Sequence, residues 1–241
     1  MIAQNPKVSV VIPVHNEAGT LNALVGELQT HLTGLVGDNW EIVVVDDAST
    51  DPVVFPDRMR ADDRFVLRRL PQRRGSGHVR RLGSAEAKGD WIAWIDGDGT
   101  YLAKDLCRLL AQLAEADQVI GARTDDHGPW RLLRLAVKGV TCRVASWLWR
   151  TRIPDLNSGL RVFRREGLMA YLHEVPDGFS CVTTATLAAM NRGQKVAFVP
   201  IAYRPRPVGS KSKFHPLWDT LRLWRVIHRQ WRLQPARPAK R

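Results

Sequence analysis

Two carboxylates at the end of a short hydrophobic run are the residues of this sequence best placed to do chemistry. The run "WIAWI" is followed at once by Asp96 and Asp98, which stand two positions apart with a glycine after each. Two like charges held this close repel each other unless a cation or hydrogen-bond donors compensate them. Carboxylate oxygens suit Mg²⁺ or Mn²⁺, which complete their shells with water and substrate phosphate oxygens. The pattern therefore indicates a metal and diphosphate site, although an Asp-Gly turn without a ligand would read the same.

Polar side chains also follow two other hydrophobic runs. Asp46 and Asp47 come directly after "EIVVV", and either carboxylate could accept a hydrogen bond from a nucleobase N–H or simply cap a turn. After "VSVVIPV" come His15, whose flat ring can stack, and Glu17, whose oxygens suit ribose hydroxyls. Together these residues predict a nucleotide pocket beside the acidic turn.

The hydrophobic runs are themselves strands of a predicted α/β fold. Val- and Ile-rich runs alternate with helical patterns, which favours a mainly parallel sheet covered on both faces. Ligands of such sheets bind outside the carboxyl ends of the strands, so the polar residues that follow different strands should meet there. We expect strands at 7–14, 40–46, 64–70, 90–96 and 117–123, and helices at 18–32, 76–89 and 102–116.

The second half of the chain is less regular. A long basic helical pattern is followed by a polar turn with a short strand, a helix, a strand that runs into a basic loop, and a final helix. These elements occupy about 128–155, 157–168, 179–194, 195–214 and 215–233.

The positive charge of the chain is concentrated at its C-terminal end. The net charge is +12, with 36 Lys and Arg against 24 Asp and Glu, and residues 204–241 hold eleven basic residues and one acidic residue. This tail therefore carries +10, and residues 1–203 carry +2. A local basic patch predicts a polyanionic partner: a nucleic acid, an anionic membrane surface or phosphate groups.

The tail helix has the composition of a helix that lies in a membrane interface. At about 100° per residue, one face gathers apolar side chains and another gathers arginines. Each basic residue near an anionic leaflet contributes about 1 kcal/mol to binding. The alternative is that the apolar face packs on the chain's own domain or on a second subunit. The apolar face holds Leu217, Leu221, Trp224, Ile227 and Trp231, and the basic face Arg222, Arg225, Arg229 and Arg232.

Other patterns favour a cytoplasmic protein. The sequence has no run of eighteen apolar residues, so no transmembrane helix is predicted. Polar residues interrupt the first hydrophobic run, so no signal peptide is predicted either. Cys107, Cys142 and Cys181 are too far apart for a disulfide framework or a metal site, which fits a reducing compartment.

Five motifs in this order resemble family 2 glycosyltransferases with the GT-A fold: "VSVVIPVHNE", "EIVVVDDASTD", "WIAWIDGDG", "VIGAR" and "NSGLRVFRRE". Within that family they are most similar to the polyprenol-phosphate branch, which includes dolichol-phosphate mannose synthase. The resemblance covers about residues 7–213. It implies a Rossmann-like, three-layer α/β/α GT-A domain over 1–206, followed at 207–241 by a basic loop and an amphipathic membrane-interface helix.

The resemblance also assigns roles on the donor side. Two positions depart from the family pattern, because His15 replaces a usual tyrosine and Thr100 a usual glutamine that is a further metal ligand. A threonine hydroxyl could ligate the metal or hold a metal-bound water. By resemblance, Pro13, His15 and Glu17 line the nucleoside pocket, Asp47 contacts the base, Asp96, Gly97 and Asp98 hold the donor sugar, diphosphate and Mg²⁺ or Mn²⁺, and Arg206 with Lys213 closes over the diphosphate. Lys211 competes with Lys213 for the last role, because the spacing is one residue longer than expected.

On the acceptor side, Arg123 of "VIGAR" matches an arginine that grips the acceptor phosphate in relatives. A bidentate guanidinium suits that task. Arg134 and Lys138, one helical turn apart, and Ser158 in the "NSG" turn complete the predicted acceptor site.

The predicted activity is a metal-assisted, inverting hexosyl transfer that builds cell-envelope glycolipids. The donor is a nucleotide diphosphate-sugar, either GDP-mannose-like or a UDP-sugar, and the acceptor is a dolichyl or undecaprenyl phosphate. The enzyme is expected at the inner face of the cell membrane, attached peripherally to its anionic surface, with an integral membrane partner left open.

Two other function classes remain as alternatives. One is a soluble glycosyltransferase that acts on a polysaccharide or protein. The other is a basic nucleic-acid-binding protein. The sequence has no nucleic-acid recognition motif, and its acidic residues lie where a ligand would bind, so no nucleic-acid partner is expected.

Overall fold

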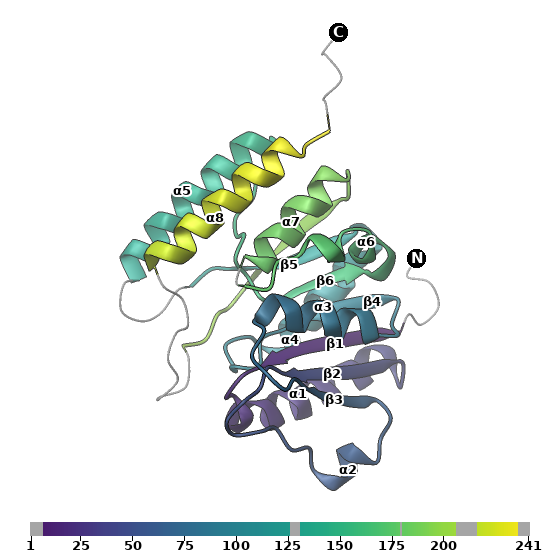
Figure 1. Ribbon diagram of the computed structural model, residues 1–241. Coiled ribbons are helices and arrows are strands. Elements are labelled where there is room, and N and C mark those ends of the chain that lie inside the picture. The colour runs from purple at the N-terminus through teal and green to yellow at the C-terminus, as the bar shows by residue number, and fades with distance from the viewer. Residues whose placement is uncertain (1–6, 126–130, 179, 206–215, 236–241) are drawn as a thin grey trace.

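A seven-stranded sheet with helices on both faces forms the centre of the computed structural model, which describes residues 7–125, 131–178, 180–205 and 216–235 (Figure 1). For 131–134 and 216–219 it describes the backbone alone. The predicted α/β class is thereby confirmed. The first half comprises β1 (Val8–Val14), α1 (Ala18–Val36), β2 (Trp40–Asp46), α2 (Asp57–Arg60), β3 (Phe65–Arg69), α3 (Ser76–Glu86), β4 (Trp91–Trp94), α4 (Ala103–Ala111) and β5 (Gln118–Arg123). The second half comprises α5 (Arg131–Trp149), β6 (Arg161–Arg164), α6 (Arg165–Met169), α7 (Cys181–Asn191), β7 (Val196–Ile201) and α8 (Pro216–Arg232), and short 3₁₀ turns lie at 112–114 and 172–174.

The strand order is β3-β2-β1-β4-β6-β5-β7, and β6 alone among them runs antiparallel to its neighbours. The reversal matters for the site. Arg161, the first residue of β6, pairs with Trp94, the last residue of β4. The polar turn that precedes β6 therefore lies at the same edge of the sheet as the acidic turn that follows β4.

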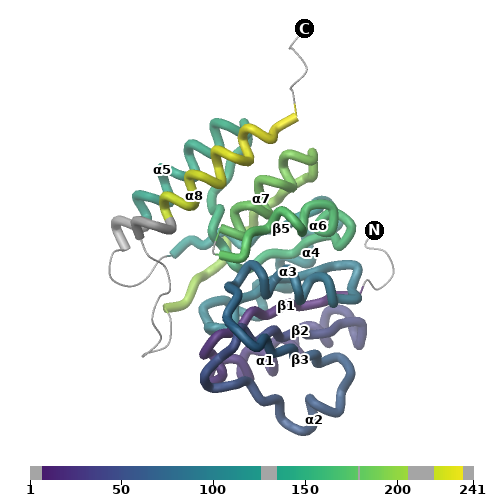
Figure 2. The backbone as a smooth tube through the Cα atoms, viewed as in Figure 1, coloured from purple at the N-terminus to yellow at the C-terminus, as the bar shows by residue number. Residues whose placement is uncertain are grey.

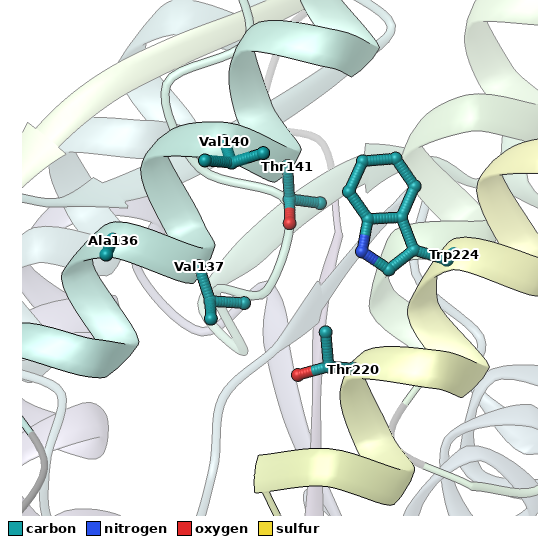
Figure 3. Close-up of a pocket in the computed structure, with 6 residues that line it drawn as sticks. All are labelled: Ala136, Val137, Val140, Thr141, Thr220 and Trp224. Carbon is teal, nitrogen blue, oxygen red and sulfur yellow. The ribbon is translucent and has the colours of Figure 1, made fainter.

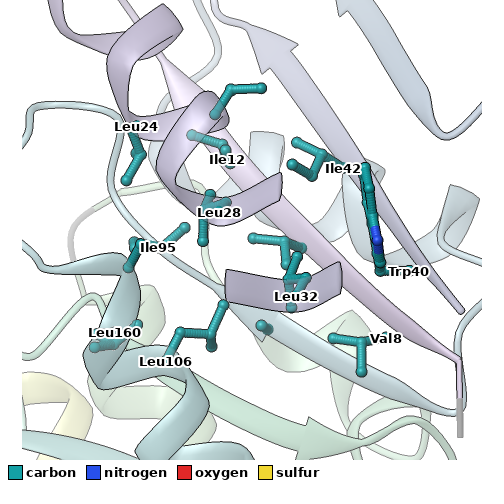
Figure 4. Close-up of a cluster of buried hydrophobic side chains, with 14 of the residues drawn as sticks. Val8, Ile12, Leu24, Leu28, Leu32, Trp40, Ile42, Ile95, Leu106 and Leu160 are labelled. Carbon is teal, nitrogen blue, oxygen red and sulfur yellow. The ribbon is translucent and has the colours of Figure 1, made fainter. Parts of the chain in front are cut away.

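The sheet is buried on both faces because successive side chains of a strand point to opposite sides. On one face, α1 places Leu24, Leu28 and Leu32 at helical spacing over Ile12 and Ile42 (Figure 4). Burying each such leucine stabilises the fold by about 1.5–3 kcal/mol.

The opposite face is covered by α3, α6 and α7. Helix α3 comes very close to the sheet, because a Cβ on Gly83 would lie 2.5 Å from Cγ1 of Val11. Glycine at this position therefore sets how near the helix lies to β1.

Helices α5 and α8 lie side by side at one end of the molecule (Figure 2). Leu223 and Ile227 of α8 are buried in a third cluster with residues of α5 and α7, and Asn191 donates to the Gln230 carbonyl at 2.8 Å. A helix is present where the tail helix was predicted, and Ile227 of its predicted apolar face packs on the domain, as the alternative to membrane contact expects. Ile227 is 1% exposed because one side of α8 packs on the domain. No helix within the described residues is long and apolar enough to cross a membrane.

Candidate active site

The loops after β1, β2 and β4 are joined by hydrogen bonds at the carboxyl edge of the sheet. Nδ1 of His15 lies 2.8 Å from the carbonyl oxygen of Asp47, and the hydroxyl of Thr20 donates to the carbonyl of Gly97 at 2.6 Å. A Cβ on Gly97 would stand 3.4 Å from Oε2 of Glu17. The structure thus brings His15, Glu17, Asp47 and the acidic turn into one region, as the parallel strands require.

The loop after β1 is fixed onto the loop after β2. Asn16 has a positive φ of 58°, a region that asparagine tolerates better than most residues. Its side-chain oxygen accepts the Thr50 N–H at 2.9 Å, and its own N–H donates to Ser49 Oγ at 2.9 Å. Pro13 is buried inside β1, one residue before the end of that strand. The hydrogen bond to Asp47 orients His15, and the place of Pro13 in the nucleoside pocket stays a prediction.

The two acids after β2 have different surroundings. Asp47 accepts the N–H groups of Arg74 and Gly75 at 2.6 and 2.9 Å, so it ties its loop to the start of α3. Asp46 is 1% exposed; one oxygen accepts the Ser49 N–H at 2.9 Å. Its Oδ2 accepts no hydrogen bond from the described residues and lies 3.9 Å from Nε of Arg69. The contact of Asp47 with a base stays a prediction, and Oδ2 of Asp46 is an acceptor oxygen that receives no hydrogen bond from the described residues.

The acidic turn after β4 has one carboxylate fixed by its own loop. Oδ1 of Asp98 accepts the N–H of Thr100 at 3.1 Å and its hydroxyl at 2.6 Å, while Gly99 takes a positive φ of 73° to close the turn. Thr100 is fully buried. Its hydroxyl proton therefore orients Asp98, and its role as a metal ligand stays a prediction.

The other carboxylate, Asp96, is paired with a residue from a different element. Its Oδ1 forms an ion pair with the buried guanidinium of Arg80 in α3. Its Oδ2 packs on Gly159, where any Cβ would overlap the carboxylate. The side chain of Asp96 is nevertheless 32% exposed.

The donor set fits a divalent metal that shares its shell with a substrate. Within the described residues no group of three or more His, Cys, Asp or Glu side chains could hold a metal ion. Mg²⁺ and Mn²⁺ are commonly held by one or two carboxylates, with phosphate oxygens and water as the other ligands. Asp98, oriented by Thr100, would supply such a carboxylate.

On the acceptor side, the structure holds Arg123 and Lys138 on one buried acid, Asp155. Arg123 donates to both oxygens of Asp155, from Nε at 2.8 Å and from Nη2 at 3.0 Å, and Nζ of Lys138 lies 3.1 Å from Oδ2. Burial alone would raise the pKa of Asp155, but Arg123 and Lys138 hold that pKa well below its ordinary value. The cluster therefore keeps one net positive charge, and the side chains of Arg123 and Lys138 are 20% and 24% exposed.

The turn before β6 lies between these two charged clusters. Gly159 donates its N–H to the hydroxyl of Tyr101 at 2.7 Å, and Ser158 Oγ lies 3.5 Å from the same oxygen. Ser158 is fully buried, and its carbonyl accepts from the Arg161 guanidinium at 2.7 Å. Contact of Ser158 with an acceptor phosphate stays a prediction that would need this turn to move.

The sequence profile described as "Glycosyl transferase family 2" matches residues 9–172, which include the strands β2 to β6, all but the first residue of β1, and both charged clusters. The chain belongs to glycosyltransferase family 2. The prediction of a glycosyltransferase in this family is confirmed.

Relatives of this glycosyltransferase agree with the branch that the motifs indicated. It is 30% identical over 216 residues to glycosyltransferase AglJ of Haloferax volcanii, covering 88% of this chain and 68% of that protein. It is also 30% identical over 218 residues to polyprenol monophosphomannose synthase of Mycolicibacterium smegmatis, covering 83% of this chain and 78% of the relative. Undecaprenyl-phosphate 4-deoxy-4-formamido-L-arabinose transferase of Pectobacterium carotovorum is 27% identical over 176 residues, which are 72% of this chain and 53% of that protein.

Solved structures confirm the GT-A fold of the glycosyltransferase. Glucosyl-3-phosphoglycerate synthase from Mycobacterium tuberculosis, in complex with Mn²⁺, UDP and phosphoglyceric acid, superposes with a TM-score of 0.69. The match covers 94% of this chain and 78% of the other at 18% identity, so it speaks for the fold alone.

Some residues of the site were not predicted from the sequence, and some predicted ones lie outside the described part. The side chain of Arg134 and all of Arg206, Lys211 and Lys213 are not described. Arg80 and Asp155 are as important to the geometry as the predicted residues. Arg80 stands in a basic helix and reads as a solvent-exposed charge, and Asp155 precedes the "NSG" motif without a pattern of its own.

Proposed function

We propose that this glycosyltransferase transfers a hexose from a nucleotide diphosphate-sugar to a polyprenyl phosphate. The observation that carries the proposal is the pair of partly exposed cations, Arg123 and Lys138, held on the buried Asp155 at the same sheet edge as the acidic turn. A site with an anchored net positive charge suits an acceptor that is itself a phosphate. The polyprenyl and undecaprenyl phosphate named in two relatives are acceptors of this chemistry.

On the donor side, the nucleoside would lie among the joined loops after β1 and β2. Asp98 would hold Mg²⁺ or Mn²⁺, which supplies neutralisation of the diphosphate leaving group. The M. tuberculosis neighbour was solved with Mn²⁺ and UDP, which supports a divalent metal in this fold. Thr100 keeps the Asp98 carboxylate in one orientation before the donor arrives.

A phosphate acceptor also fits the carboxylates around the site. A hydroxyl acceptor needs a base to take its proton, whereas a phosphate is already an anionic nucleophile. Asp96 and Asp155 are each paired with an arginine, and Asp98 accepts the Thr100 hydroxyl. Arg123 and Lys138 would bind and orient the phosphate for a single in-line displacement, which inverts the anomeric centre.

The surface formed by α5 and α8 supports attachment to the inner face of the cell membrane. Five of the seven large hydrophobic side chains that are exposed within the described residues lie on α5, on α8 or directly after α8. An apolar groove of about 230 Å³ runs between the two helices, with Trp224 facing Val140 and Thr141 (Figure 3). Exposed aromatic and aliphatic groups beside arginines are typical of interfacial helices. The exposed groups are Val140, Trp147, Leu221, Trp231 and Leu233.

The test supplies the purified full chain with labelled nucleotide-sugars and three acceptors: polyprenyl phosphate in detergent, 3-phosphoglycerate and a free oligosaccharide. One of the donors is expected to transfer its label to the lipid when Mg²⁺ or Mn²⁺ is present. No transfer is expected when EDTA removes the metal. Asp98→Ala is the matched control, expected to abolish transfer while the circular dichroism spectrum is unchanged. Transfer to phosphoglycerate or oligosaccharide with none to the lipid would refute the proposed acceptor.

A further inference from the structure

Asn157 is the exposed side chain of the turn that lies between the two charged clusters. Residues 155–160 are all described, and within them Asn157 alone is exposed to solvent. Its neighbour Ser158, which the family resemblance assigned to the acceptor phosphate, is fully buried. A substrate that reaches this turn as it stands therefore meets the side chain of Asn157 and not that of Ser158.

The side chain of Asn157 is held in one orientation by a buried hydroxyl. Oγ1 of Thr183, in α7, donates to Oδ1 of Asn157 at 2.8 Å, and Thr183 is fully buried. With the amide reversed, the hydroxyl could donate only to the Leu156 carbonyl at 3.4 Å, which is a poor distance. Nδ2 is therefore the end of the amide that faces away from Thr183, and no described residue accepts a hydrogen bond from it.

The backbone of Asn157 is bonded to the acid that holds the two cations of the acceptor side. Its N–H donates to Oδ1 of Asp155 at 2.9 Å. Arg123 binds the same carboxylate with Nε and Nη2, and Nζ of Lys138 lies 3.1 Å from its Oδ2. One buried acid thus places three donor side chains, those of Asn157, Arg123 and Lys138, beside one another.

Arg123 cannot turn to replace a lost donor, because it is held on its face as well as on its edge. The guanidinium carbon lies 5.2 Å from the centre of the Tyr203 ring, while Nε and Nη2 bind Asp155. A cation over an aromatic ring is stabilised in that position. The direction in which Arg123 presents its remaining N–H groups is therefore fixed by the fold.

The charge and the donors of this cluster suit a phosphate monoester. Two cations and one carboxylate leave a net charge of +1, and Asn157 adds an N–H donor without adding charge. A phosphate monoester presents three strong acceptor oxygens. Two of them can meet the cations, which leaves the third for a neutral donor.

We propose that the carboxamide of Asn157 binds the phosphate group of the acceptor through Nδ2, together with Arg123 and Lys138. Thr183 is the positioning residue that aims this carboxamide. The inference rests on the acceptor half of the proposed function and adds a residue to that site. It is independent of the nucleotide, the metal and the length of the lipid chain.

Calorimetry of the full chain in EDTA, without a nucleotide-sugar, measures binding of geranyl phosphate, a short prenyl phosphate. Asn157→Ala removes the donor and is expected to weaken binding about tenfold, the effect of one hydrogen bond to a charged group. Asn157→Asp still accepts from Thr183 but cancels the net charge of the cluster, so it should weaken binding at least about a hundredfold.

Asn39→Asp is the matched control for the change of charge. Asn39 directly precedes β2 and so lies at the opposite edge of the sheet, and its replacement should leave geranyl phosphate binding unchanged. Binding within about twofold of the wild type in both Asn157 variants would overturn the inference. A loss in Asn157→Asp alone would show that the charge is near the phosphate without a hydrogen bond, and it would overturn the inference as well.

Thr183→Val tests the positioning role, because it keeps the shape of the side chain and removes its proton donor. It is expected to weaken geranyl phosphate binding about threefold in the wild-type background and to change nothing in the Asn157→Ala background. Thr183→Ser, which keeps the hydroxyl, should bind as the wild type does. Equal losses from Thr183→Val in both backgrounds would show that Thr183 does not act through Asn157.

Two phosphate probes separate this inference from the proposed function. A wild type that binds 3-phosphoglycerate but not geranyl phosphate, with the same losses in the Asn157 variants, would refute the polyprenyl acceptor and keep the role of Asn157. Undiminished binding of geranyl phosphate by both Asn157 variants would overturn that role and leave the proposed function standing. A wild type that binds neither phosphate would overturn both.

Discussion

At the scale of single residues, the site depends on two ion pairs that cross between elements. Arg80 of α3 meets Asp96 after β4, and Arg123 of β5 meets Asp155 before β6. Each pair buries a charge that its partner compensates, and each leaves one partner partly exposed to the site. Removal of one member is costly because the other remains as a desolvated charge.

Asp155→Asn is expected to destabilise the fold by about 3–5 kcal/mol, since Arg123 and Lys138 lose their shared counter-charge. It should also raise the KM for the acceptor by a larger factor than it changes the Kd of the donor. Urea denaturation and two-substrate kinetics measure the two effects. Asp125→Asn, an exposed acid nearby, is the control and should change neither; equal losses in both variants would contradict the assignment.

The same carboxylate gives a prediction for pH. Arg123 and Lys138 hold the pKa of Asp155 below its unfolded value, so this contribution to stability is fully present above about pH 5 and is lost as the pH falls toward the lowered pKa. The free energy of unfolding of the wild type should therefore fall more steeply between pH 5 and pH 3 than that of Asp155→Asn. Denaturation curves at four pH values test this, and parallel slopes would rule it out.

At the scale of elements, the antiparallel strand β6 brings the turn at 155–160 under both charged clusters. Gly159 packs on Asp96, Tyr101 accepts the N–H of Gly159, and Asp155 holds Arg123 and Lys138. One turn therefore fixes the separation between Asp96 and the two cations proposed to bind the acceptor.

Gly159→Ala should displace Asp96 and lower kcat/KM for the donor by about a hundredfold, the effect of a misplacement near 1 Å. The measurement is initial rates with varied donor, with the fold followed by circular dichroism. Gly139→Ala in α5 is the matched control, because its Cβ would meet nothing within 4 Å. A full rate in Gly159→Ala would show that the position of Asp96 is not critical.

The elements themselves were largely predictable, and the pairings were not. The alternation of hydrophobic runs located the strands β1 to β5 and the helices α1, α3 and α4, because periodicity is a local property; the short α2 was not predicted. The reversal of β6 and the partners of Arg80 and Asp155 depend on contacts across 16 and 32 residues of sequence, which local patterns do not encode. The tail helix was predicted as a helix, but the helical wheel does not show which part of its apolar face the domain covers, and Ile227 lies in the covered part.

At the scale of the whole molecule, the α5 and α8 surface stands at one end and α2 at the other (Figure 1). Attachment to an anionic membrane should therefore depend on charges at one end only. Replacing Arg225 and Arg229 of α8 by glutamine is expected to weaken binding to anionic vesicles by about 2 kcal/mol, roughly thirtyfold. Arg58 and Arg60 of α2, replaced in the same way, form the control.

Vesicle co-sedimentation at several fractions of anionic lipid measures this binding. The α8 variant should be lost from the vesicles as salt rises, and the α2 variant should behave as the wild type does. Equal retention of both variants would show that α8 does not face the membrane.

Binding of the acceptor phosphate by Arg123 and Lys138 underlies the proposed function, and the kinetics of Arg123→Ala are the decisive measurement. The variant and the wild type are compared in a matrix of donor and polyprenyl phosphate concentrations, with donor binding measured by calorimetry. In the variant the acceptor KM is expected to rise at least about tenfold while the donor Kd stays within about twofold. An equal loss on both sides, or a change in the donor alone, would contradict it.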